Sequence, residues 1–245
     1  MKLAVIYSGT VRYLPELIEN HRAALLDRYD CDVYFHFWDI YGKTASGVME
    51  TVSVNELPLT NEEKNRIVAL LNPKAYRFES TLDTDEYLSS IVAKFIDVRA
   101  NTRNSVGMFY SMYEAQNLFT RYASQHNITY DGVVRIRPDL DFVLNNDTYI
   151  TLPPPEPNTL YIMSPDYHRY SPDNLPGISD QLGMGTSEVM TIYNGVFEEL
   201  VQRGPDPYAT PTVLHPEDMV LQRIRSHNIS VVHTQPIHYT IRRVA

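Results

Sequence analysis

Hydrophobic and polar positions along the chain form two alternating kinds of segment. Short apolar or aromatic runs predict strands, and stripes of apolar residues spaced three and four apart predict helices. The predicted strands cover residues 2–7, 31–39, 74–79, 133–137, 159–163 and 229–233. The predicted helices begin at about residues 14, 60, 108, 186 and 216. This alternation is typical of a mostly parallel sheet with helices on both faces, so we expect an α/β fold.

Several boundaries have a recognisable chemical cause. In "TNEE", Glu63 follows Thr60 by three residues, which is a capping box that starts a helix, and the helix is expected to end before Asn72-Pro73. Residues 41–58 and 97–107 are weakly patterned and are expected to be irregular. The proline-rich stretch at 152–158 suits either a loop or a domain linker. Because strands are predicted on both sides of it, we expect one domain over residues 1–245.

Charge and cysteine content exclude several classes of protein. The chain has 30 acidic and 21 basic side chains and a formal net charge of −9, whereas nucleic-acid binding needs a basic surface. We therefore expect no nucleic-acid partner. A single cysteine, Cys31, rules out an internal disulfide and a multi-cysteine zinc site, and it fits a reducing, cytoplasmic compartment. No long apolar run without charges is present, so no transmembrane segment is expected.

Candidate chemistry gathers where predicted strands end, which is where ligands bind in sheets of this kind. The first strand ends in "YSGTVR". Ser8 and Gly9 predict a tight turn whose backbone N–H groups can face a ligand, and Arg12 can reach a phosphate. A plain turn between a strand and a helix explains the same residues.

The second cluster is "RIRPDLD", at the end of an apolar run. Alternate residues of a strand share a face, so Arg135 and Arg137 point one way, and Pro138 is expected to end the strand. Asp139 and Asp141 follow it. Two carboxylates in this spacing suit a divalent cation, and nearby guanidinium groups suit phosphate. A network of Arg–Asp pairs without a ligand is the alternative interpretation.

The third cluster is "HPEDM", at the start of a predicted helix. Glu217 and Asp218 there are stabilised by the helix dipole, or one of them is a general base aimed at a substrate hydroxyl. Asp180, which ends the long segment 164–180, is a competing base or a turn residue. His233 and His238 are either buried neutral side chains or metal ligands.

Six segments together resemble the glycosyltransferases of the GT-A fold, a Rossmann-like α/β fold. They are "IYSGTVRYL", "DVYFHFWD", "MFYSMYEAQNL", "YDGVVRIRPDLDF", "ISDQLGMGTSEVMTIY" and "HPEDMVLQRI". Their order is similar to that of WavE-like proteins and of glycosyltransferases from lipopolysaccharide and capsule loci and from large viruses. The resemblance covers most of the chain from Ile6 to Ile229, and it implies polysaccharide biosynthesis.

The resemblance implies a nucleotide-sugar donor and a divalent metal, Mn²⁺ or Mg²⁺, at a DxD motif. It assigns the donor to the first-strand loop and the diphosphate to the neighbourhood of the second cluster. The implied contacts of the nucleotide and its phosphates are Ser8, Gly9, Arg12, Arg135 and Arg137. The implied metal ligands are Asp139, Asp141 and His233, with His238 as the alternative histidine. Arg137 and Pro138 directly before Asp139 depart from the better-known DxD pattern, so Arg135 and Arg137 can neutralise the diphosphate instead of a metal.

The implied reaction moves a hexosyl or deoxyhexosyl group to a glycan or other hydroxyl acceptor with inversion. Asp218, Glu217 and Asp180 are the catalytic candidates. The nucleotide would bind to about residues 1–142 and the acceptor to about 143–245, including the tyrosine-rich segment 164–180. A sugar-phosphate nucleotidyltransferase and a non-catalytic sugar-binding protein of the same fold are the alternatives.

Overall fold

The computed structural model describes residues 1–42, 58–94, 100–143, 150–163, 178–203, 216–234 and 238–241. Its strands are β1 (Lys2–Thr10), β2 (Asp30–Trp38), β3 (Ala75–Glu79), β4 (Gly132–Ile136), β5 (Leu140–Phe142), β6 (Thr159–Ile162), β7 (Leu182–Gly185), β8 (Ser230–His233) and β9 (Tyr239–Ile241). Its helices are α1 (Leu14–His21), α2 (Asn61–Leu71), α3 (Thr81–Val92), α4 (Ala100–His126), α5 (Ser187–Asn194), α6 (Val196–Arg203) and α7 (Pro216–Ser226). A π-helical turn, η1 (Arg22–Leu26), follows α1. Most of the segments predicted as loops at 41–58 and 164–180 lies outside the described residues.

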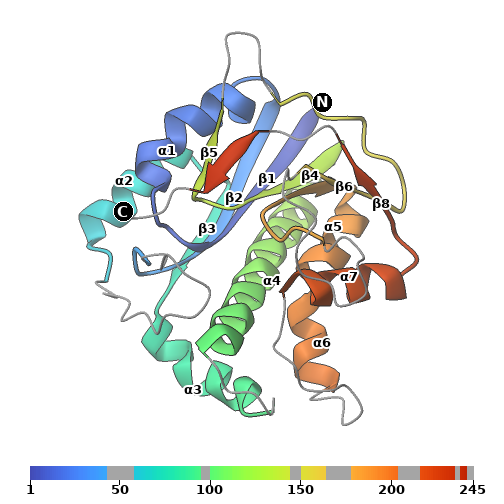
Figure 1. Ribbon diagram of the computed structural model, residues 1–245. Helices are drawn as coiled ribbons and strands as arrows, with labels where there is room; N and C mark the ends of the chain where they lie inside the picture. The colour runs from blue at the N-terminus through green and yellow to red at the C-terminus, as the bar shows by residue number, and fades with distance from the viewer. Residues whose placement is uncertain are drawn as a thin grey trace.

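The main sheet has seven strands in the order β3-β2-β1-β4-β7-β6-β8 (Figure 1). Its pairings are parallel except for those of β7, which runs antiparallel to both β4 and β6. The predicted mostly parallel sheet is therefore confirmed. From β1 the chain builds outwards to β2 and β3 on one side, and β4 then pairs with its other edge. Ligands of such sheets bind outside the carboxyl ends of the strands at this kind of switch point, here between β1 and β4.

Helices cover both faces of the sheet, and a separate apolar core lies between each face and its helices (Figure 1). Successive residues of a strand point to opposite faces. Ala4 and Ile6 of β1, with Val133 of β4, pack in one core with residues of α4, α5, α6 and α7. Leu3 and Val5 pack in the other core with residues of α1 and α2. The nearly continuous apolar run of β1 thus follows from burial on both sides, as for a central parallel strand.

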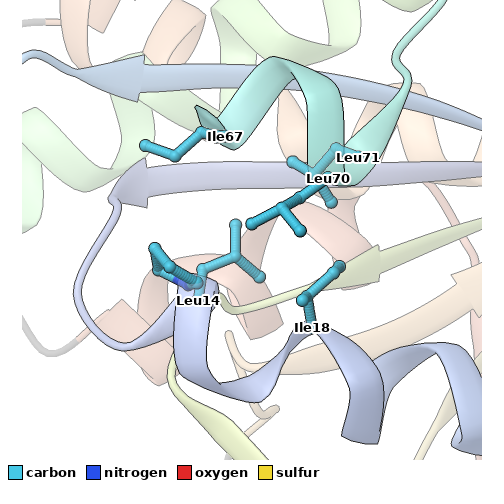
Figure 2. Close-up of a pocket in the computed structure, with 6 residues that line it drawn as sticks. Leu14, Ile18, Ile67, Leu70 and Leu71 are labelled. Atoms are coloured by element: carbon cyan, nitrogen blue, oxygen red, sulfur yellow. The ribbon is translucent and has the colours of Figure 1, made fainter. Parts of the chain in front are cut away.

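Helices α1 and α2 lie against each other on the second face. Figure 2 shows Leu14 and Ile18 of α1 turned toward Ile67, Leu70 and Leu71 of α2. The hollow between them is lined by apolar side chains. The apolar contacts around this hollow hold the two helices together, and the side chains that line it offer no polar group to a charged ligand.

The capping box predicted at the start of α2 is confirmed. The Glu63 backbone N–H donates to Thr60 Oγ1 at 3.3 Å, and the Thr60 N–H donates to Glu63 Oε2 at 2.7 Å. At the other end Asn72 adopts the left-handed conformation, with φ 44°, and its N–H bonds to the Val68 carbonyl. The helix therefore ends where the Asn72-Pro73 pair predicts.

Other expectations need correction. Helix α4 begins at Ala100, several residues before the predicted start near 108, so the polar segment there is partly helical. The helix predicted from 186 to about 202 is two helices, α5 and α6, which separate at Gly195. Strand β7 and helix α3 were not predicted, because "LGMG" has two glycines and no polar alternation and α3 has a weak apolar stripe. None of the helices described is both long and apolar enough to span a bilayer.

Candidate active site

The predicted tight turn at Ser8-Gly9 is wrong, because β1 continues to Thr10, but the end of this strand and the loop after it do have an unusual backbone. Gly9 has φ 108° and Arg12 has φ 50°, and a bulky residue rarely adopts a positive φ. The Arg12 N–H donates to the Tyr41 carbonyl at 2.8 Å, and its Nε donates to Thr10 Oγ1 at 3.0 Å. These contacts hold Arg12 at the carboxyl end of β1, whose last residue is Thr10.

Strand β4 ends at Ile136, and the chain then brings Asp139 back against two arginines. Arg137 donates to Asp139 Oδ1 from Nε and to Oδ2 from Nη2, each at 2.8 Å, and Arg12 Nη1 donates to Oδ2 as well. The Asp139 side chain is fully buried, whereas those of Arg12 and Arg137 are 25% and 18% exposed. We call these three residues the Arg–Asp–Arg cluster.

The two guanidinium groups decide the ionisation of Asp139. Burial by itself would raise the pKa of this carboxyl, but the hydrogen bonds and positive charges of Arg137 and Arg12 outweigh burial and hold the pKa well below its usual range. Asp139 is therefore an anion at neutral pH. The cluster itself has two positive charges against one negative charge, and the nearby carboxylate of Asp180 partly offsets the difference.

Two buried polar side chains, one on β1 and one on β4, lack hydrogen-bond partners within the described part of the chain. Arg135 is 1% exposed, and none of its three guanidinium nitrogens has a partner; the Oγ of Ser8, 3% exposed, has none either. Burial lowers the pKa of Arg135, while Tyr193 and Asp180 oppose this shift. An unpaired buried cation is costly, so Arg135 is a candidate for contact with an anionic or strongly polar ligand.

The start of α7 lies close enough to the switch point to interact electrostatically with it. Burial, followed by the negative charge of Asp180, raises the pKa of Glu217 to about 6; Asp218 raises it further and Arg137 opposes the rise. Asp180 is 5% exposed. The structure thus brings Glu217, Asp180 and Arg137 together, from α7, the segment before β7 and the end of β4. A carboxylate with a pKa near neutrality suits a general base.

The structure does not group the three predicted metal ligands, Asp139, Asp141 and His233, into one site. Asp141 lies on β5, where it pairs with Thr240 of β9. His233 ends β8, which the sheet order separates from β4 by β7 and β6, or roughly 14 Å at about 4.8 Å per strand. His238 is closer to Asp141, because its carbonyl accepts from the Val143 N–H at 2.8 Å and continues the β5–β9 ladder. Among the residues that the structure describes, no three His, Cys, Asp or Glu side chains are grouped as a metal site.

A buried hydrogen-bond network supports the end of β1 and was not predicted. Ser111 Oγ of α4 accepts from the Gly9 N–H at 2.7 Å and lies 2.9 Å from His36 Nδ1. His36 Nε2 lies 2.7 Å from Glu79 Oε2, and Tyr110 donates to Glu79 Oε1 at 2.9 Å. The network therefore ties the backbone of Gly9 to β2, β3 and α4. The sequence contained a weak signal for it, namely a histidine and a serine at positions that otherwise face the core.

Comparison with known proteins gives only distant similarity. No protein-family model matches the chain. No curated protein sequence matches it. The structure is similar to mouse xyloside xylosyltransferase 1, with TM-score 0.42 and 14% identity over 95% of this chain and 84% of that one. It is also similar to a glycosyltransferase involved in glycosylation of the major capsid of PBCV-1, with TM-score 0.43 and 11% identity over 96% and 83% of the two chains.

A third similar structure is the galactosyltransferase LgtC with donor and acceptor sugar analogues, with TM-score 0.45 and 11% identity over 94% of this chain and 72% of that one. These are glycosyltransferases, the class that the sequence resembles. Because all three TM-scores lie below 0.5 and identities are at most 14%, the similarity assigns neither family membership nor activity. The fold and the site define an α/β protein with the Arg–Asp–Arg cluster at its switch point and, beside it, a carboxyl group, Glu217, whose pKa is raised.

Proposed function

We propose that the protein is a glycosyltransferase of GT-A type that moves a hexosyl or deoxyhexosyl group from a nucleotide-sugar to a glycan hydroxyl. One observation carries the proposal: the positively charged Arg–Asp–Arg cluster and the raised pKa of Glu217 occur at the same switch point. Sugar transfer needs both parts, because positive charge must stabilise the departing diphosphate and a base must accept the proton of the incoming hydroxyl.

The proposed reaction is a single displacement at the anomeric carbon. The acceptor oxygen forms a bond to this carbon while the bond from the carbon to the β-phosphate oxygen breaks, and the electron pair leaves with the nucleoside diphosphate. Glu217 takes the proton of the acceptor hydroxyl, and Asp218, the next residue of α7, is the alternative base. Arg12 and Arg137 neutralise the departing charge. Attack from the opposite side inverts the anomeric configuration.

The sequence also predicts a divalent cation at this site. Bound Mn²⁺ or Mg²⁺ would supply positive charge to the diphosphate. Asp139 does not suit this role, because its carboxylate already accepts three hydrogen bonds from two guanidinium groups. His233 is three strands away from β4. The ligand set Asp139, Asp141 and His233 remains a prediction that the arrangement of these side chains does not favour.

The proposal is tested by measuring sugar transfer and nucleoside diphosphate release with a panel of nucleotide-sugars, as a function of pH. If Glu217 is the base, kcat/KM rises with pH through an apparent pKa near the value of about 6 and then levels off. Glu217→Gln should lower kcat/KM by about 10²–10⁴-fold. Glu19→Gln, on the exposed side of α1, is a matched control and should leave the rate unchanged.

Two results would contradict the proposed glycosyltransferase activity, and a third would change only the residue assigned as the base. Pyrophosphate release from a nucleoside triphosphate and a sugar phosphate would indicate the nucleotidyltransferase. Sugar binding without transfer from any donor would indicate the non-catalytic protein. Retained activity in Glu217→Gln, together with an inactive Asp218→Ala variant, would assign the base to Asp218 and leave the transferase standing.

A further inference from the structure

Asp139 occupies the position at which the sequence predicts a metal ligand, yet the structure uses it to fix two arginines. Arg137 grips both carboxylate oxygens through parallel N–H bonds, and Arg12 reaches across from the loop after β1. The two arginines come from different strand ends, and the carboxylate between them holds their guanidinium groups side by side. Such forked contacts fix orientation as well as distance.

The charges of the cluster oppose a cation. A divalent ion bound to Asp139 would lie next to two guanidinium groups, and this repulsion in a largely buried site is only weakly screened. Arg135 is a third, fully buried cation that interacts electrostatically with Arg137 and Asp139 and has no hydrogen-bond partner among the described residues. Asp180 partly offsets the charge of all three arginines, but both groups that contact Asp139 directly are cations, which favours an anion over a metal ion at this point.

Among the residues that the structure describes, contacts of Arg12 and Arg137 leave some of their N–H donors for such an anion. A guanidinium has five N–H donors. Arg137 uses two of its nitrogens for Asp139, and Arg12 uses Nη1 for Asp139 and Nε for Thr10. Both side chains are partly exposed, so a ligand can approach them. Guanidinium groups arranged in this way match the geometry of phosphate oxygens.

We propose that Arg12 and Arg137, positioned by Asp139 and reinforced by the buried charge of Arg135, bind the diphosphate of the nucleotide-sugar directly and without a divalent cation. This inference rests on the proposed function, since it concerns the donor of that reaction. The arginines take over the charge stabilisation that a metal would provide, and Asp139 acts through them as a positioning residue.

Calorimetric titration of the purified protein with UDP, GDP, ADP, CDP and dTDP tests the inference, each in EDTA and in Mn²⁺ or Mg²⁺. We expect one nucleoside diphosphate to bind in EDTA with an affinity within about threefold of that in metal. The corresponding monophosphate should bind at least about tenfold more weakly in EDTA, since it lacks the second phosphate. Binding that disappears in EDTA overturns the inference that Arg12 and Arg137 bind the diphosphate without a metal, but it leaves the glycosyltransferase proposal intact. Failure of every nucleotide to bind, with or without metal, overturns both.

Variants separate positioning from folding. Arg12→Lys keeps the charge and removes the fork, and it should weaken diphosphate binding in EDTA by about 10–100-fold, the loss of a charge-assisted contact. Arg22→Lys, in an exposed pair with Asp27, is the matched control and should not change binding. Asp139→Asn, studied where circular dichroism shows it to be folded, should lose about tenfold in diphosphate affinity with unchanged monophosphate affinity. Equal losses for both nucleotides, or wild-type affinity in Arg12→Lys, would contradict the inference.

Discussion

Replacing Asp139 by asparagine removes the negative charge that separates two guanidinium groups. The carboxylate accepts three hydrogen bonds from Arg12 and Arg137 and is fully buried. The amide of asparagine can still accept through its oxygen, but its NH₂ group would face an arginine donor. The two cations would then repel each other without a counter-ion. Removing one partner of a buried ion pair costs about 3–5 kcal/mol, and because both arginines are partly exposed we expect the lower end, about 3 kcal/mol.

This loss is large enough to measure by thermal unfolding. For a chain of this size a change of 1 kcal/mol moves the Tm by about 2–4 °C, so Asp139→Asn should lower the Tm by about 6–12 °C at pH 7. The control is Asp27→Asn. Asp27 pairs with Arg22 at 3.4 Å, but the two side chains are 57% and 44% exposed, so the change should stay within about 0.5 kcal/mol.

The Tm difference between wild type and Asp139→Asn should also depend on pH. The folded-state pKa of Asp139 is depressed below its unfolded value of about 3.9, so its contribution to stability is fully present well above that pH and is lost as the pH falls below it. The Tm gap between wild type and Asp139→Asn should therefore be constant above about pH 5 and narrow below about pH 4. A Tm change no larger than that of Asp27→Asn, or a gap independent of pH down to acid unfolding, would refute the assigned ion pairs.

Three further outcomes are expected. The pKa of Glu217 is about 6 in the folded protein and lower in the unfolded chain, so ionisation of Glu217 destabilises the fold as the pH rises through 6. Glu217→Gln should therefore stabilise the fold by about 1 kcal/mol at pH 7 and by less at pH 4.5, measured by urea unfolding, and equal effects at both pH values would contradict this. Ser111→Ala leaves the Gly9 N–H without its buried acceptor and should lower the free energy of unfolding by about 1–2 kcal/mol. The same variant should raise the KM for the nucleotide-sugar more than it lowers kcat, and an unchanged KM would argue against a role of Ser111 in donor binding. Thr60→Ala breaks the capping box with Glu63 and should cost about 1 kcal/mol in urea unfolding with no change in kcat/KM; a loss of activity at unchanged stability would show that α2 affects the site.

Much of the architecture could be predicted from local pattern. The strands at Lys2–Thr10 and Asp30–Trp38 are apolar because both faces of the sheet are covered, and Thr60 with Glu63 starts a helix by a contact between near neighbours. These features depend on residues close together in the chain. The prediction therefore succeeded where the local pattern and the final environment agree.

The remainder depends on partners that are distant in sequence. Arg12 and Asp139 are separated by 127 positions, and His36 and Ser111 by 75, so no local spacing indicates either contact. The direction of β7 is likewise a property of the sheet and not of "LGMG". The charged cluster at the end of β4 was identified as a ligand site or a set of Arg–Asp pairs, and the structure shows the pairs.

The pairing of β1 with β4 has a consequence for how the protein folds. Leu3 pairs with Gly132, so the central pair of strands closes a very long loop, whereas β1 and β2 can meet early in synthesis. Until β4 arrives, one edge of the apolar strand β1 stays open and is exposed to pairing with other chains. Long-range parallel pairing is slow to form. The slowest step of folding should therefore be the insertion of β4, and the Arg–Asp–Arg cluster, which bridges β1 and β4, would form only when that step is complete.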